Sequence, residues 1–212
     1  MTDLPPRWRR RKDARPAEIV AAALDAFAER GFAATRLEDV AARAGISKGT
    51  LYLYFPSKEE LFKAVVRQTL LPNLAEAERR LATSDMPTPE MLSEIVGALV
   101  AAAAGRMGVI PKLLIAEAGN FPDLARFYAE EVVARGMRLF ARVIQRGIAR
   151  GEFRAVDAVR AAPALAAPIL LMALWKNALE PHAVHPIDPA GFFAAFIDIV
   201  LHGLAAETGR KG

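Results

Sequence analysis

The residues best suited to chemistry lie between Lys48 and Tyr54, and the chemistry they offer is hydrogen bonding to nucleic acid. The stretch has the pattern of a short helix whose inner face carries Leu51 and, just beyond it, Phe55. Its outer face holds a lysine, a threonine and two tyrosines, which can donate to phosphate oxygens or contact base edges. A glycine among them lets the backbone approach a large partner. We predict that this face approaches DNA bases through Lys48, Gly49, Thr50, Tyr52 and Tyr54.

Helix start and stop signals precede that stretch. Thr35 with Glu38 fits a capping box, so a helix should begin one residue after Thr35. Gly45 supplies the left-handed position that ends this helix, and Ser47 is the expected N-cap of the next. Only Ile46 lies between them, so the two helices must meet at a steep angle. The pattern predicts a helix-turn-helix. The plainer alternative is a packing motif with an ordinary amphipathic surface.

A further helix should follow directly. Pro56 stops the preceding helix, and Ser57 with Glu60 forms a second capping box. Lys58 falls in the first turn, where a helix N-terminus beside a cation is a natural seat for phosphate. We therefore expect residues at the helix starts to hold the chain on DNA, chiefly at phosphates: Thr35, Arg36, Ser47 and Lys58.

Residues 1–15 are predicted to form a flexible basic arm. Two adjacent prolines are followed by RWRRRK, which has no apolar period. Such an arm can enter a minor groove or lie along phosphates, and the alternative is a solvated charged tail. Pro16 then opens a helix that should end at Gly31. The arm residues expected to contact DNA are Arg9, Arg10 and Arg11.

Residues 41–62, A-x-x-A-G-I-S-K-G-T-L-Y-x-Y-F-x-S-K-E-E-L-F, resemble the DNA-binding domain of the TetR (tetracycline repressor) family of bacterial regulators. The resemblance covers about residues 16–65. It implies an all-helical homodimer whose N-terminal domains read a palindromic operator in double-stranded DNA and whose larger C-terminal domains bind a small-molecule effector. We accordingly divide the chain into a basic arm (1–15), a helix-turn-helix DNA-binding domain (16–62) and a ligand-binding and dimerisation domain (63–212).

Composition supports this division. The 212 residues are 53% hydrophobic and rich in alanine, which favours an all-α fold, and they contain no cysteine for disulfides, thiol catalysis or thiolate metal sites. The net charge of +4 resides in the first 67 residues, as expected for a nucleic-acid surface joined to a neutral body. The longest uncharged run, Ala161 to Trp175, contains two prolines and is short for a bilayer span. We expect a cytoplasmic protein with no membrane partner.

The last two predicted helices, about Asp157 to Leu179 and Pro189 to Ala206, are apolar on every side. A helix that is apolar all round must be covered all round, and the chain has few segments left to cover these two. We expect an isologous four-helix interface in a homodimer. The candidate interface residues are Leu171, Leu174, Phe192, Phe196, Ile199 and Val200.

A ligand would bind among the body helices, which begin with a long helix from Ser57 that Pro72 should kink. Its pocket should accept an apolar or aromatic molecule, although each candidate residue would serve equally well as core. The candidates are Met107, Ile110, Phe121, Phe127, Tyr128, Phe140, Met172 and Trp175.

No catalytic, cofactor or metal site is predicted. The three histidines, His182, His185 and His202, lie late in the chain with no serine nucleophile or glycine-rich phosphate loop beside them. On the TetR resemblance, we predict a repressor that a small apolar or aromatic ligand releases from its operator. The alternatives are a ligand-independent architectural protein or activator, a helical-bundle enzyme, for which the residues give little support, and a membrane-surface protein that uses the basic arm.

Overall fold

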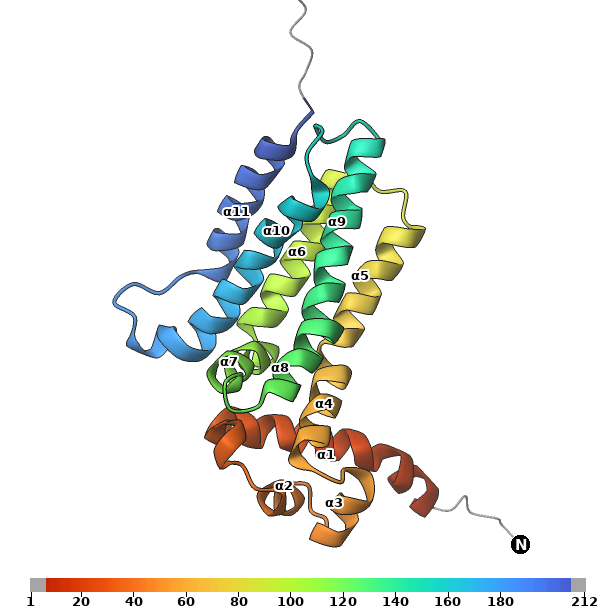
Figure 1. Cartoon of the computed structure of the whole chain (residues 1–212), viewed down its shortest axis with the longest axis vertical. Coiled ribbons are helices and arrows are strands. Elements are labelled where there is room, and N and C mark those ends of the chain that lie inside the picture. The colour runs from red at the N-terminus through yellow and green to blue at the C-terminus, as the bar shows by residue number, and fades with distance from the viewer. Residues whose placement is uncertain (1–6, 207–212) are drawn as a thin grey trace, which may run out of the picture.

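The computed structural model describes residues 7–206, with side chains from residue 16 onward. The fold is all-α, as predicted, and Figure 1 shows a small group of helices below a longer bundle. The lower group contains α1 (Arg7–Ala34), α2 (Leu37–Arg43), α3 (Lys48–Tyr54) and the start of α4 (Lys58–Thr69). The bundle contains α5 (Leu71–Thr83), α6 (Thr88–Ala104), α7 (Val109–Glu117), α8 (Pro122–Tyr128), α9 (Ala134–Ala149), α10 (Ala158–Leu174) and α11 (Pro189–Leu204).

Helix α1 begins at Arg7 and not at Pro16, so the predicted start of this helix is wrong. Arginine, lysine and alanine are strong helix formers, which explains why the basic run continues the helix on the N-terminal side of the proline. The expected stop appears as a break, because Gly31 has a φ of 80° inside the span. The arm residues Arg9, Arg10 and Arg11 have a helical backbone, their side chains lie outside the described part, and their DNA contacts stay a prediction.

The corner between α2 and α3 has the predicted geometry. Gly45 adopts a φ of 65°, and its N–H donates to the Ala42 carbonyl at 3.1 Å. The Ile46 N–H donates to the Ala41 carbonyl at 3.0 Å, which completes a Schellman motif. The Ser47 hydroxyl then accepts from the Thr50 N–H at 3.1 Å and caps α3. These bonds fix the direction in which α3 leaves the corner.

Thr35 does not cap α2, contrary to the prediction. The N-cap of α2 is Arg36, which makes no side-chain cap bond, and the Thr35 side chain is only 1% exposed. Its hydroxyl lies 2.6 Å from the Gly31 carbonyl and 3.1 Å from the Ala26 carbonyl, so it donates to the end of α1. A buried hydroxyl needs such a partner, and the broken helix turn at Gly31 supplies one. Thr35 therefore stabilises the corner from inside and presents no side chain to a phosphate.

Phenylalanine rings fill the core beneath the helix-turn-helix. Phe32 meets Phe62 edge to face at 5.2 Å between ring centroids and meets Phe121 at 4.8 Å. Phe121 directly precedes α8, and buried residues of α7 and α8 belong to the same core cluster. The core of the DNA-binding domain thus extends into the helices above it.

The bundle is built around α10. This helix packs against α9 and α6.

The long helix predicted from Ser57 is divided into α4 and α5. The break lies at Leu70, two residues before Pro72, which was expected to kink a single helix. Two π-helical segments, Ala129–Val133 and Trp175–Leu179, follow α8 and α10.

By length and composition the continuous helical stretch Ala158–His182 is able to span a bilayer, which the two prolines had argued against. A core helix of a bundle passes the same test. Helix α10 lies in the bundle with neighbours on both sides (Figure 1), but only 33% of its most apolar window is buried, so packing within the bundle accounts for part of its apolar character.

Candidate nucleic-acid interface and apolar cavity

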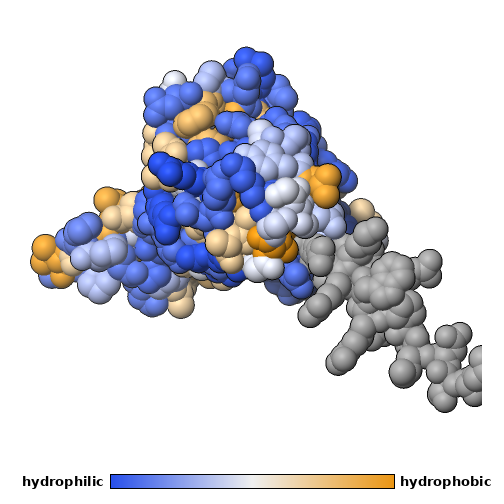
Figure 2. All heavy atoms as spheres, turned by 90° about the horizontal axis from the view of Figure 1, so that it is seen from below, coloured by the Kyte–Doolittle hydropathy of each residue, from blue (hydrophilic) through white to orange (hydrophobic). Residues whose placement is uncertain are grey.

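The exposed face of α3 carries the residues predicted to approach bases. Tyr52 is 42% exposed, and Lys48 and Gly49 are also exposed, whereas Thr50 and Tyr54 are half-buried. Seen from the end of the molecule that carries α2 and α3, the surface is mainly hydrophilic (Figure 2). The helix is anchored from behind by Leu51, which is fully buried. Its outer face is therefore free for a partner.

Leu53 also belongs to this face, although it was not among the predicted residues. It is 85% exposed, next to two tyrosines, on a helix whose other apolar residue is buried. An exposed leucine can contact the methyl group of thymine, which polar side chains cannot recognise as well. The sequence did carry a signal for this, because residues two apart in a helix lie about 200° apart, so an inward Leu51 places Leu53 on the outer face.

Lys48 is held in place by α2. Its ammonium forms an ion pair with Glu38 and lies 5.7 Å from the centroid of the Tyr52 ring. The hydrogen bond with Glu38 raises the pKa of Lys48 and lowers the pKa of Glu38. Both side chains are exposed, so salt screens the pair and a phosphate can compete for the lysine. Arg36, at the start of α2, is exposed on the same domain.

Lys58 is directed inward. Its ammonium donates to the carbonyls of Phe32 (2.8 Å) and Ala33 (2.9 Å), and it lies 4.6 Å from the centroid of the Phe32 ring. Burial lowers the pKa of this lysine, partly offset by Glu59 and Glu117. In this arrangement Lys58 closes the end of α1, and most of its hydrogen-bonding capacity is already used.

The bundle contains an apolar cavity of about 570 Å³ that is partly open to solvent. Its wall is formed by α5, α6, α7, α8, the π-helical turn Ala129–Val133, α9 and α10. The volume lies within the range of small-molecule sites. Three predicted pocket residues line it, namely Met107, Tyr128 and Phe140.

The other five predicted pocket residues lie elsewhere, and their assignment to the pocket is corrected here. Ile110 and Phe127 are buried in the core beneath the helix-turn-helix, with Phe121 packed against them. Met172 is fully buried in the bundle core. Trp175 does not line the cavity, and its indole N–H is buried without a partner in the described residues. Large apolar side chains here mostly pack against one another.

Small residues contribute to the cavity beside the large ones. Its lining includes Gly108, Gly136 and seven alanines, which leave room between helices: Ala102, Ala103, Ala118, Ala125, Ala129, Ala166 and Ala167. Sequence reasoning sought big side chains that would touch a ligand. The available signal was instead the run of alanines on several helices, which leaves space only where the helices are held apart.

The comparisons with known proteins agree with this arrangement. The family pattern described as "Bacterial regulatory proteins, tetR family" matches residues 19–65, and the pattern "Tetracyclin repressor-like, C-terminal domain" matches residues 90–187. The uncharacterized HTH-type transcriptional regulator YfiR of Bacillus subtilis is 31% identical over 148 residues, which cover 69% of this chain and 71% of YfiR. The chain belongs to the TetR family. It is therefore a DNA-binding transcriptional regulator of a family that is not enzymatic.

Other relatives match almost the whole chain. The HTH-type transcriptional repressor KstR2 of Rhodococcus jostii is 27% identical over 197 residues, covering 92% of this chain and 93% of KstR2. The solved structure of a SmeT–triclosan complex superposes with a TM-score of 0.77 at 23% identity, covering 92% of this chain and 93% of SmeT. At that identity the likeness shows the fold alone.

The residues predicted for a subunit interface divide into two sets in this TetR-family chain. Leu171 and Ile199 are exposed, the latter by 70%. Phe192, Phe196 and Val200 are half-buried against the core of their own bundle, and Leu174 is half-buried as well. Helix α11 therefore uses its phenylalanines for its own subunit, and the face left open is the opposite one.

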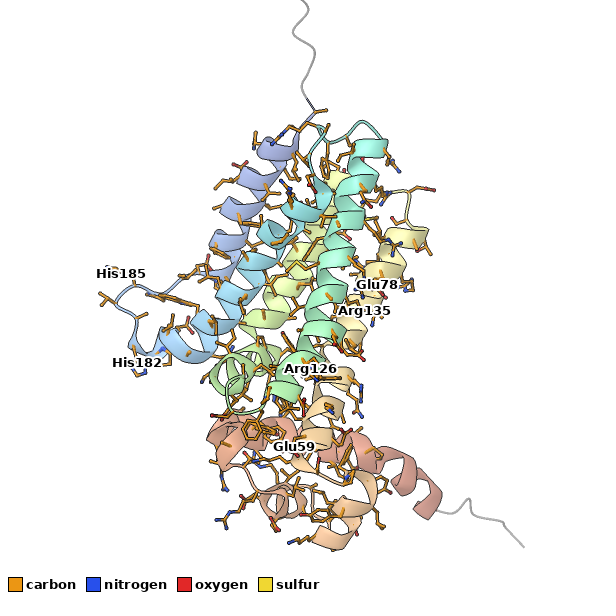
Figure 3. All side chains as sticks on the ribbon, viewed as in Figure 1. Glu59, Glu78, Arg126, Arg135, His182 and His185 are labelled. Atoms are coloured by element: carbon orange, nitrogen blue, oxygen red, sulfur yellow. The ribbon has the colours of Figure 1, made fainter. Side chains whose placement is uncertain are left out.

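No metal site is evident in residues 16–206, where side chains are described: they contain no group of three or more histidine, aspartate or glutamate side chains placed to hold an ion. His182 ends the short helical turn Glu180–His182, and His185 lies on the projecting loop that follows it before α11 (Figure 3).

Proposed function

We propose that this protein is a cytoplasmic, homodimeric TetR-family repressor that leaves a palindromic operator when a small apolar or aromatic molecule enters the cavity. The observation that carries the proposal is the position of the cavity. Its wall includes α7, and α7 also packs on α1 of the DNA-binding domain. A ligand that binds more tightly to one placement of α7 would shift the equilibrium between two arrangements of the DNA-binding domain, and the shift equals the difference between its two binding free energies.

Three contacts support this coupling. Leu114 of α7 lines the cavity and also belongs to the core beneath the helix-turn-helix. Glu117, at the end of α7, accepts from the Ala33 N–H at 3.2 Å. Arg106, just before α7, forms an ion pair with Asp25 of α1. A displaced α7 would disturb packing, a hydrogen bond and an ion pair of α1 together.

The dimer proposal is supported by the outer faces of α10 and α11. On α11 an exposed row spaced four residues apart holds three small residues, Gly191, Ala195 and Gly203, and one large apolar side chain, Ile199. On α10 the exposed side chains Leu170 and Leu171 are apolar. Small residues allow two helices to approach closely, and a two-fold axis would bring the same faces of two copies together.

The dimer is tested with Ile199→Lys. A lysine in the centre of a closely packed interface would leave an unpaired buried charge, so we expect a folded monomer by light scattering with an unchanged circular dichroism spectrum. Gln145→Lys, at an exposed position of α9, is the matched control and should remain a dimer. A dimeric Ile199→Lys variant would contradict the proposed interface.

Operator binding and release are tested by fluorescence anisotropy on the DNA that flanks the gene for this chain, with and without extracts of apolar metabolites. Tyr52→Ala should abolish sequence-specific binding while leaving the fold intact. Gly136→Leu should retain DNA binding and lose the response to the extract, because a Cβ at Gly136 meets only Leu74, at 4.0 Å, and a longer side chain would fill the cavity. The control is Ala98→Leu, on an exposed part of α6 outside the cavity.

The outcomes separate the proposal from its alternative. The proposal of a ligand-released repressor is supported if an extract reverses DNA binding by the wild type but not by the Gly136→Leu variant. Specific binding that no extract affects, in the wild type as in Gly136→Leu, favours a ligand-independent architectural protein or activator.

A further inference from the structure

The wall of the cavity contains no charged residue. Not one aspartate, glutamate, lysine, arginine or histidine is among the side chains that line it, although a quarter of the chain is charged. An ionised group moved from water into such a site would lack a partner and would lose several kcal/mol of hydration, by general estimates. A ligand that buries a carboxylate or an ammonium group against this wall is therefore disfavoured.

Two side chains give the wall its hydrogen-bonding capacity. The Asn73 amide nitrogen donates to the Thr69 carbonyl (3.1 Å) and contacts the Met107 sulfur (3.2 Å), which orients the amide and leaves its oxygen as an acceptor without a donor among the described residues. Tyr128 also lines the cavity, and its hydroxyl has no hydrogen-bond partner among the described residues. Neither polar group is among the fully buried atoms that lack a partner, so both reach open space at the cavity wall and are available to a ligand there.

The Tyr128 hydroxyl stays neutral under ordinary conditions. Burial raises the pKa of Tyr128 to about 12, so at neutral pH the phenol can donate and accept a hydrogen bond but carries no charge to attract a cation. A ligand hydroxyl donates and accepts at once, so it can donate to the Asn73 amide oxygen and can bond the Tyr128 phenol in either direction.

We infer that the cavity selects an uncharged molecule with an apolar body and one hydroxyl head, and that Asn73 and Tyr128 recognise this head. The volume of about 570 Å³ corresponds to a molecule of roughly 20 non-hydrogen atoms if each occupies about the 30 Å³ of a water. This ligand class rests on the proposed function, because it takes the cavity as the effector site.

Asn73 lies where a bound head group could affect the connection between the bundle and the DNA-binding domain. It lies at the start of α5, and its amide holds the carbonyl of Thr69, the last residue of α4, across the break between the two helices. Helix α4 begins in the DNA-binding domain. A ligand hydroxyl bound to Asn73 would therefore act at the joint between cavity and DNA-binding domain.

The test uses two probes of similar size, 4-octylphenol and 4-octylbenzoate, below their aggregation limits at pH 7.5. Isothermal titration calorimetry on the wild type should show binding of the phenol and at least tenfold weaker binding of the carboxylate. Tyr128→Phe and Asn73→Leu should each weaken the phenol about 3- to 10-fold, the value of one hydrogen bond. Met137→Leu, an apolar change in the same wall, is the control and should leave the preference between probes unchanged.

Equal or tighter binding of the carboxylate, binding of neither probe, or a phenol affinity that both polar variants leave unchanged would overturn the inference. Fluorescence anisotropy of operator DNA, measured with each probe, distinguishes failure of the ligand class from failure of the proposed function. If the phenol binds as expected but leaves the DNA complex intact, the ligand class stands and ligand release fails. If the carboxylate releases DNA and the phenol does not, release stands and the ligand class fails.

Discussion

Replacing Lys58 by methionine separates two roles for this lysine, because the sequence assigns it to a phosphate and the structure to the end of α1. Methionine keeps the apolar stem and removes the ammonium. The change deletes two charge-assisted hydrogen bonds, to the carbonyls of Phe32 and Ala33, and a contact with the Phe32 ring. If the lysine closes α1, the variant should lose stability and not a DNA contact.

The magnitude follows from the site. Hydrogen bonds to a charged group contribute about 1.5–3 kcal/mol each, and a cation over an aromatic ring about 0.5–1 kcal/mol. Two terms reduce the sum: burial of the ammonium, which lowers the pKa of Lys58, and the exposure of Ala33, whose carbonyl water can reach. We expect a net loss of about 1–2 kcal/mol. For a chain of this length that lowers the Tm by roughly 2–8 °C.

The assay pairs thermal unfolding with the salt dependence of operator binding. Each phosphate contact contributes about 0.9 to the slope of log K against log salt. Lys58→Met should lower the Tm and leave the slope unchanged. The matched variant Lys48→Met, whose side chain is 59% exposed on α3, should lower the slope by about 0.9 and leave the Tm nearly unchanged. A Lys58→Met protein with normal Tm and a slope reduced by about 1 would refute the structural reasoning and restore the phosphate contact.

Three further predictions concern the bundle. Arg135 holds the carboxylate of Glu78 with two hydrogen bonds and lowers the pKa of Glu78, with each side chain 29% exposed (Figure 3). A lowered pKa stabilises the fold above the unfolded value near 4.5, so Glu78→Gln should cost about 1 kcal/mol at pH 7, and the difference in urea denaturation should be lost as the pH falls through the lowered pKa of Glu78. Gly147→Ala should destabilise by about 1–2 kcal/mol despite better helix propensity, because its Cβ would lie 2.2 Å from the buried ring of Phe153; a more stable variant in urea would contradict this. Burial raises the pKa of Tyr128 to about 12, so the neutral phenol stabilises the fold below the unfolded value near 10, and this stabilisation is lost as the pH rises through about 12. The phenolate absorbance of Tyr128, measured as the difference between wild type and Tyr128→Phe, should therefore appear near pH 12. Its appearance near pH 10 in folded protein would show that the phenol is exposed.

The local geometry of the helix-turn-helix was predictable because local rules determine it. Gly45 and Ser47 act through their own backbone and the next few residues, and both adopt the expected conformations. Thr35 carries an equally good capping signal, yet its hydroxyl turns to carbonyls of α1, which becomes available only through tertiary packing. Lys58 shows the same effect, since its position in a helix's first turn says nothing of the chain end beside it.

The cavity was less predictable because a void is a property of the assembled helices and not of one residue. Periodicity marks Met172 and Tyr128 alike as inward-facing, but the former is core and the latter wall. What separates them is the size of the residues opposite, which a single chain position does not encode. The sequence also did not determine which side of α11 would face a partner. Its apolar residues cover two sides of the helix, and only one side faces its own bundle.

The packing of α7 explains how one chain can join these parts. If the helix-turn-helix had a core separate from that of the bundle, a ligand in the bundle would displace only the segment that links the two. Instead Leu114 belongs to the cavity wall and to the core that supports α3 through Leu51 and Phe62. Close-packed cores transmit displacement because they lack free volume to absorb it. Under the proposed function, a ligand that favours one position of α7 by a few kcal/mol would change the populations of DNA-binding and released forms by orders of magnitude.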